Sequence, residues 1–270
     1  MELEDPVHQN IGGAVAVAAP HARVGASTPR FYLVMAAIYL AIAVAGFSPT
    51  FWVPMMKGTL HVPPITYVHA LFFYGWVVLF LVQTSLAASG NLHFHRELGV
   101  FGVAVATGMC FAATGLLINS LKRFEAAGMG AAERPIAIVS AAGVVVISTM
   151  FTTAMLNVKK PEVHKRVMLA LTSFLLQAGI GRLIAFFLVG DVRTAHLSPP
   201  PPVAVTLVAS VPTDLLLIIP MIYDRRTRGR VHPAYWLAGA YILAVQVAII
   251  PLSSTHAWLR VTDWLIALSP

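Results

Sequence analysis

Apolar residues occur along the chain in seven long blocks that are separated by short polar segments. A helix needs about 20 apolar residues to cross the roughly 30 Å hydrocarbon core of a bilayer, because each residue adds ~1.5 Å. Each block reaches about that length. We therefore predict an all-α, polytopic transmembrane helix bundle with about seven spans, near 31–48, 66–88, 98–119, 135–156, 167–189, 203–223 and 234–252.

We place the bundle at residues 30–256. The segments before and after it are not expected to span the membrane. Residues 1–29 are rich in Ala, Val and Gly and are expected to form a flexible N-terminal tail. Residues 257–270 are too short to span, and their two tryptophans favour a position in the membrane interface. Prolines are expected at helix starts, where the missing amide costs least, at Pro64, Pro135 and Pro161.

The composition agrees with a membrane protein. Of the 270 residues, 58% are hydrophobic and only 11% are charged, and the mean hydropathy is +0.78. A soluble domain carries about 25% charged residues, so the chain has too little charge to cover a water-facing surface. We therefore expect an integral membrane protein surrounded by lipid bilayer, in a bacterial cytoplasmic (inner) membrane.

The basic residues that give the formal charge of +7 lie mainly in the loops. Almost every Lys and Arg lies between apolar blocks, which is typical of topology determinants and lipid-headgroup contacts, so no nucleic-acid partner is expected. More of them fall on the side that holds the N-terminus and the loops near 89–97, 157–166 and 224–233. The positive-inside rule therefore predicts a cytoplasmic N-terminus.

Each of these three basic loops places a histidine at the entry to the next span. His95, His164 and His232 are 69 and 68 residues apart, and His93 lies beside the first of them. Neutral imidazole is a good ligand for haem iron, zinc or copper. We predict that His95 and His164 are axial haem ligands, with His232 or His93 as a substitute. A metal set of His93, His95 and His164 is an alternative, and lipid contact with helix capping is the structural interpretation.

A second pattern lies within one span. His69, Trp76 and Gln83 are seven residues apart and share one helix face. A polar and aromatic stripe inside a membrane faces the bundle interior, either to line a cavity or to make interhelix hydrogen bonds. In the first case His69 binds a cofactor and Trp76 and Gln83 line its cavity. With Arg182, His69 is also expected to line an outer cavity for a quinone-like or lipidic molecule.

Arg182 and Asp214 are charged residues inside predicted spans. Such charges cost at least ~2.5–3.5 kcal/mol each on insertion scales, so they tend to be paired and functional. We predict an Arg182–Asp214 pair, which serves as a structural ion pair, a proton relay, an anion or propionate clamp, or a substrate site. Pro212 and Pro220 flank Asp214, and prolines that bend a span are common beside binding sites.

The histidine segments resemble those of an uncharacterised group of bacterial multi-pass membrane proteins. The similar stretches are 69–73 with 90–99, 134–135 with 160–168, and 228–236, and the resemblance runs from about residue 30 to the end. It implies the fold and little more. The chain is also loosely similar to helical b-type cytochromes, in which histidines on neighbouring helices hold haem. Near the outer face of the membrane the chain has only His69 within a span, with His61 nearby in a loop. That likeness therefore implies at most one bis-histidine haem b.

These observations favour a redox-associated, electron-transfer membrane protein with one b-type haem or metal near the cytoplasmic face. One alternative is a transporter or permease with a midplane site at Arg182 and Asp214. Another is a non-catalytic assembly or partner subunit that contacts a second membrane protein. The sequence contains no Walker-type phosphate loop and no His-Glu-x-x-His zinc helix. Whether the chain is an enzyme stays open.

Overall fold

The computed structural model describes residues 29–190 and 200–268, so the predicted N-terminal tail lies outside the described residues except for Pro29, which begins the first helix. Within these two ranges the chain forms helices and connections without any strand. Seven of the described helical segments are long and apolar enough to cross a membrane. The prediction of an all-α, polytopic bundle is therefore confirmed.

The helices follow one another with short connections. In chain order they are α1 (Pro29–Phe47), the π-helix η1 (Ser48–Trp52), α2 (Val53–Met56), α3 (Pro64–Ala88), α4 (Leu92–Ala126), α5 (Gly130–Leu156), α6 (Pro161–Leu175), α7 (Gln177–Val189), the 3₁₀ turn η3 (Val203–Val205), α8 (Thr206–Arg228), α9 (Pro233–Leu252) and α10 (His256–Ala267).

Some helix boundaries differ from the predicted spans. Helix α4 has 35 residues and extends beyond the predicted 98–119 at both ends, because a helix continues past its apolar block until a residue stops it. Gly128, with a φ of +73°, follows its end and provides the left-handed conformation that commonly terminates helices. Pro64 and Pro161 begin their helices as predicted, but Pro135 lies inside α5, five residues after its start.

The predicted fifth span is two helices, α6 and α7, which meet at Leu176. The Leu176 amide bonds to the carbonyl of Ser173 at 3.0 Å, which is a tighter turn than that of an α-helix. On either side of this break the chain bonds to α8. The Ser173 hydroxyl donates to the Thr213 carbonyl at 3.1 Å, and Gln177 donates to the Ser210 hydroxyl at 2.8 Å. The break therefore changes the direction of the chain at a point where α8 holds it.

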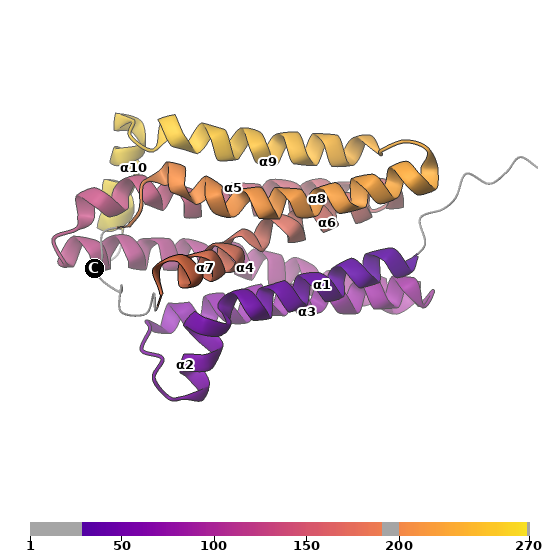
Figure 1. The fold of residues 1–270 in the computed structure, drawn as a ribbon, viewed down its shortest axis with the longest axis horizontal. Helices are drawn as coiled ribbons and strands as arrows, with labels where there is room; N and C mark the ends of the chain where they lie inside the picture. The colour runs from indigo at the N-terminus through magenta and orange to yellow at the C-terminus, as the bar shows by residue number, and fades with distance from the viewer. Residues whose placement is uncertain (1–28, 191–199, 269–270) are drawn as a thin grey trace, which may run out of the picture.

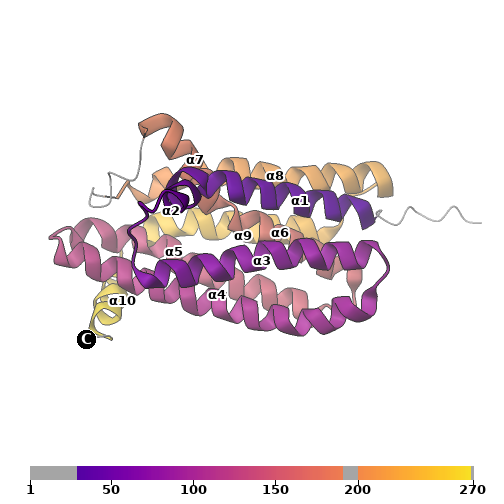
Figure 2. The same cartoon turned by 90° about the horizontal axis from the view of Figure 1, so that it is seen from below.

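The long helices lie side by side and give the bundle two ends (Figures 1 and 2). The start of α1 lies at one end with the connections 89–91, 157–160 and 229–232, and we call it the basic end. Helices α2 and α10 lie at the other, which we call the opposite end. Helix α10 is anchored there because Trp258 Nε1 donates to the Arg134 carbonyl at 2.7 Å.

The core combines large buried side chains with close helix contacts. Trp76 and Tyr39 are almost fully buried in the main apolar cluster. At Gly46, an added Cβ would lie 2.6 Å from the backbone carbon of Gly179, so α1 and α7 touch through their backbones. Large apolar side chains such as Phe111 remain exposed on the outside, as expected for a surface that faces lipid.

Candidate functional site

The basic end brings two of the predicted histidines into equivalent positions. His95 lies in the first turn of α4, and its Nδ1 is 3.2 Å from the carbonyl oxygen of Gln83 in α3. His164 lies in the first turn of α6, and its Nδ1 is 2.9 Å from the carbonyl oxygen of Ala154 in α5. A carbonyl oxygen only accepts, so each Nδ1 donates, and in the neutral imidazole the Nε2 then keeps its lone pair. Both rings therefore have the tautomer that a metal ligand requires.

The two imidazoles also lie within electrostatic range of each other. One turn after His95, Gly99 carries no side chain, and a Cβ placed there would approach just the Gln83 amide nitrogen, at 3.8 Å. The Gln83 side-chain oxygen is buried and has no hydrogen-bond partner. Around His95 the structure therefore combines a position without a side chain and an unused polar acceptor.

His232 has a different role. Its Nδ1 accepts a hydrogen bond from the Ala234 amide at 3.1 Å and caps the start of α9. Burial lowers the pKa of His232, and the positive charges of Arg166 and Arg228 lower it further. The ring is therefore neutral at neutral pH and serves as a structural cap, as the alternative interpretation of these histidines expects.

His93 is exposed, and its Nδ1 is 3.4 Å from the carboxylate of Glu97, one turn along α4. Across the described ranges, no three His, Cys, Asp or Glu side chains come together as a group able to hold a metal ion. The structure therefore does not assemble the predicted metal set of His93, His95 and His164. The reason is geometric, because His93 and His95 are two residues apart on a helix and do not share a face.

The basic end also contains a charged network that the sequence analysis missed. Arg166 and Asp224 are both fully buried. Arg166 Nε donates to Asp224 Oδ2 at 2.8 Å, and Nη2 donates to Oδ1 at 2.5 Å. Arg166 Nη1 donates to the side chain of Glu162 at 2.7 Å, and Asp224 accepts a further bond from the His232 amide at 3.2 Å. This bidentate pair holds α6 against α8.

Neighbouring side chains extend this network to two more helices. Glu162 accepts hydrogen bonds from Lys165, at 2.6 Å, and from Arg228. The Lys165 ammonium lies 5.1 Å from the ring centroid of Tyr32 in α1. The Tyr32 hydroxyl is 3.4 Å from that of Tyr235 in α9. The network therefore fixes α1, α6, α8 and α9 together next to the histidine pair.

The structure does not bring Arg182 and Asp214 together. The Arg182 guanidinium lies 4.9 Å from the ring centroid of Phe47 and donates to the Ala178 carbonyl at 3.4 Å. Asp214 accepts a hydrogen bond from Gln246 of α9 at 3.3 Å, and no ion pair joins it to Arg182 among the described residues. The predicted pair assumed a continuous fifth span. The break before α7 instead leaves Arg182 beside α1, while Asp214 contacts α9.

The predicted stripe on α3 has three different environments. Trp76 is buried, and its indole N–H donates to the Thr172 hydroxyl of α6 at 3.2 Å, which is an interhelix hydrogen bond. Gln83 lies beside the histidine pair. His69 lies nearer the opposite end, stacks on Phe73 with ring centroids 4.2 Å apart, and has a buried Nδ1 without a partner. The three residues therefore do not line one shared cavity.

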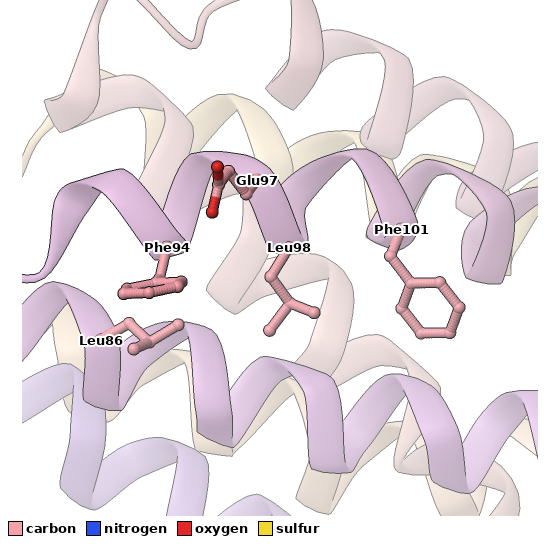
Figure 3. Close-up of a pocket in the computed structure, with 5 residues that line it drawn as sticks. All are labelled: Leu86, Phe94, Glu97, Leu98 and Phe101. Atoms are coloured by element: carbon pink, nitrogen blue, oxygen red, sulfur yellow. The ribbon is translucent and has the colours of Figure 1, made fainter.

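A groove of about 440 Å³ lies between the end of α3 and the start of α4 (Figure 3). Its lining is apolar apart from Glu97, and the close-up shows Phe94, Leu98 and Phe101 along one side of α4. Neither His95 nor His164 lines it. The groove is therefore a depression beside the histidine pair and supplies no ligand to it.

No family model, curated protein or solved structure matches this chain. Assignment of a function therefore depends on the geometry of the two bundle ends.

Proposed function

We propose that the protein binds one b-type haem at the basic end, with the Nε2 atoms of His95 and His164 as axial ligands, and that it takes part in membrane electron transfer. The single observation that carries this proposal is the matched pair of Nδ1–carbonyl hydrogen bonds. Histidines that bind metals usually donate their other ring N–H to a carbonyl or carboxylate, which fixes the tautomer and the ring orientation.

The surroundings of the pair support the same proposal. Gly99 has no side chain one turn from His95, which keeps bulk away from a position where a flat macrocycle would need room. Arg96 follows His95 and is exposed at the basic end, where a guanidinium can pair with a propionate. The network around Arg166 holds the helix that carries His164. A bound haem would supply a reversible one-electron couple, and these residues would hold and orient it.

The test is the visible spectrum of protein purified in mild detergent after expression with added haem precursor. We expect a Soret band that shifts on reduction with dithionite, together with α and β bands. His95→Leu and His164→Leu should each remove this six-coordinate spectrum, whereas His93→Leu, at an exposed position on the same helix, should preserve it. A wild-type protein that stays colourless after haem supplementation would overturn the proposal.

One observation favours a second function, proton- or cation-coupled transport at Asp214. This carboxylate lies within α8 between Pro212 and Pro220, and in the described parts of the chain its side-chain partner is the neutral amide of Gln246. Intramembrane carboxylates without a cation are typical of proton and cation pathways. In proteoliposomes, Asp214→Asn should then abolish proton or cation flux. A coloured protein with no flux would favour the haem instead.

A further inference from the structure

The opposite end of the bundle holds a second group of polar side chains, which the haem proposal does not use. Helix α1 passes there into the π-helix η1, a form that is rare and frequent at functional sites. Trp52 of η1 donates its indole N–H to the Tyr74 hydroxyl at 2.7 Å, and that hydroxyl donates to the Ala43 carbonyl at 3.2 Å. These bonds fix η1 against α3.

Arg182 of α7 is the cation of this group. Its side chain is exposed at the protein surface, and its guanidinium lies over the ring of Phe47. A guanidinium has five N–H donors, but within the described ranges Arg182 makes one long hydrogen bond, to Ala178. No carboxylate pairs with it there. A cation inside a membrane span is costly without an anionic partner, and the described part of the chain supplies none to Arg182.

Two buried polar atoms near this cation also have no hydrogen-bond partner in the part of the chain that the structure describes. They are Nδ1 of His69 and Oγ1 of Thr50, which lies in η1 one turn after Phe47. The Phe47 ring under the guanidinium lies 5.9 Å from the Tyr74 ring, and Phe73, on which His69 stacks, lines the same small cavity as Phe47. A buried polar group that stays unpaired costs free energy, so most such groups in native structures bind a protein group, water or a ligand. Among the described residues, His69 and Thr50 therefore lack an acceptor, and Arg182 has only one long hydrogen bond, at one end of α1, α3 and α7.

The space at this end limits what can bind. A cavity of about 30 Å³ lies between Phe47, Tyr74, Leu176 and Gly179. This volume is enough for one or two water molecules and too small for the ring of a quinone. Its lining is mainly apolar and includes none of Arg182, His69 and Thr50, so a ligand meets the exposed Arg182 side chain from the bilayer. This favours the lipidic member of the two ligand classes expected from the sequence.

We propose that Arg182, with His69 and Thr50, binds the anionic oxygens of an amphiphile, whose phosphate or carboxylate lies at the opposite end of the bundle and whose chains lie in the bilayer. The guanidinium supplies the charge, and the imidazole and hydroxyl donate hydrogen bonds. This site is separate from the histidine pair, since its side chains come from η1, α3 and α7 at the other end of the bundle.

The proposal is tested by native mass spectrometry of delipidated protein in detergent. The probes are phosphatidylglycerol, phosphatidylcholine with the same chains, and oleate. Wild-type protein should bind phosphatidylglycerol or oleate at least about tenfold more tightly than phosphatidylcholine, because charge-assisted hydrogen bonds are stronger than neutral ones. Preference for phosphatidylglycerol would identify a phospholipid, and preference for oleate would identify a free fatty acid. Equal binding of all three would overturn the proposal.

Variants locate the site. Arg182→Gln should lose most of this preference, and Arg260→Gln, an exposed arginine of α10 at the same end, should keep it. His69→Phe keeps an aromatic ring against Phe73 but removes the hydrogen bond, so it should weaken binding less than the loss of the charge. If Arg182→Gln does not fold, Arg182→Lys retains charge without the planar fork and should bind more weakly than wild type. Unchanged binding in the Arg182 variant that folds would refute the assignment.

Discussion

Replacing Arg166 with methionine would leave the fully buried carboxylate of Asp224 without its cation. The substitution removes two hydrogen bonds to Asp224, at 2.8 and 2.5 Å, and two to Glu162. Breaking a buried ion pair on one side costs about 3–5 kcal/mol, since it leaves an uncompensated charge. Asp224 lies in the last turns of α8, and it keeps the His232 amide as a donor. We therefore expect a loss near the lower limit, about 3 kcal/mol.

Three further variants separate the ion pair from a general effect of mutation. Arg226→Met removes an exposed arginine of the same helix end and should cost less than about 0.5 kcal/mol. The double variant Arg166→Met with Asp224→Leu removes both buried charges and should recover most of the lost stability. Arg166→Lys should fall between wild type and Arg166→Met, because an ammonium cannot reproduce the bidentate fork.

The assay is equilibrium unfolding by SDS in mixed micelles of fixed composition, followed by tryptophan fluorescence. Wild type, Arg166→Met, Asp224→Leu alone and the double variant form a double-mutant cycle, and Arg226→Met is the independent surface control. If Arg166→Met is as stable as Arg226→Met, the pair does not hold the basic end together. If the double variant is less stable than Arg166→Met by the full cost of a second independent mutation, the two residues are not coupled, and the reasoning is refuted.

Two further predictions concern packing and pH. Gly46→Ala should destabilise the protein by about 1–3 kcal/mol, because its Cβ would lie 2.6 Å from the Gly179 backbone, whereas Gly143→Ala, with no atom within 4 Å, should be neutral or stabilising in the same unfolding assay. The lowered pKa of His232 means that the folded state binds this proton less readily than the unfolded state. Stability should therefore be complete above pH values of about 6.5 and decline as the pH falls below that value. His232→Asn keeps a cap for Ala234 and should flatten this pH dependence, and an unchanged slope would contradict the assignment.

The number of spans could be predicted because a helix that crosses the bilayer needs about 20 apolar residues, and blocks of that length can be counted in the sequence. Helix ends could not, because hydropathy falls where α4 leaves the hydrocarbon, while its backbone stays helical to Ala126. The break at Leu176 could not be predicted either, because hydropathy does not mark it. Tertiary bonds to α8 lie on either side of it, and it decides where Arg182 lies.

The candidate site could be predicted only in part, because its contacts also depend on how the helices pack. The repeated loop positions of His95 and His164 predicted a shared depth, but the carbonyl partners of their rings depend on how each hairpin closes. The Arg166–Asp224 pair was missed because its members are 58 residues apart, and both lie in segments whose basic residues suggested topology. The signal that was available is the single acidic residue, Asp224, in an otherwise basic segment.

The most direct test of the histidine site is the low-temperature electron paramagnetic resonance spectrum of the oxidised, haem-supplemented protein. Two imidazole ligands should give a low-spin ferric signal, with one haem per chain. His95→Leu and His164→Leu should each convert it to a high-spin signal or remove it, and His93→Leu should leave it unchanged. A chain that takes up no haem iron, or a low-spin signal that survives both leucine substitutions, would contradict the assignment of His95 and His164.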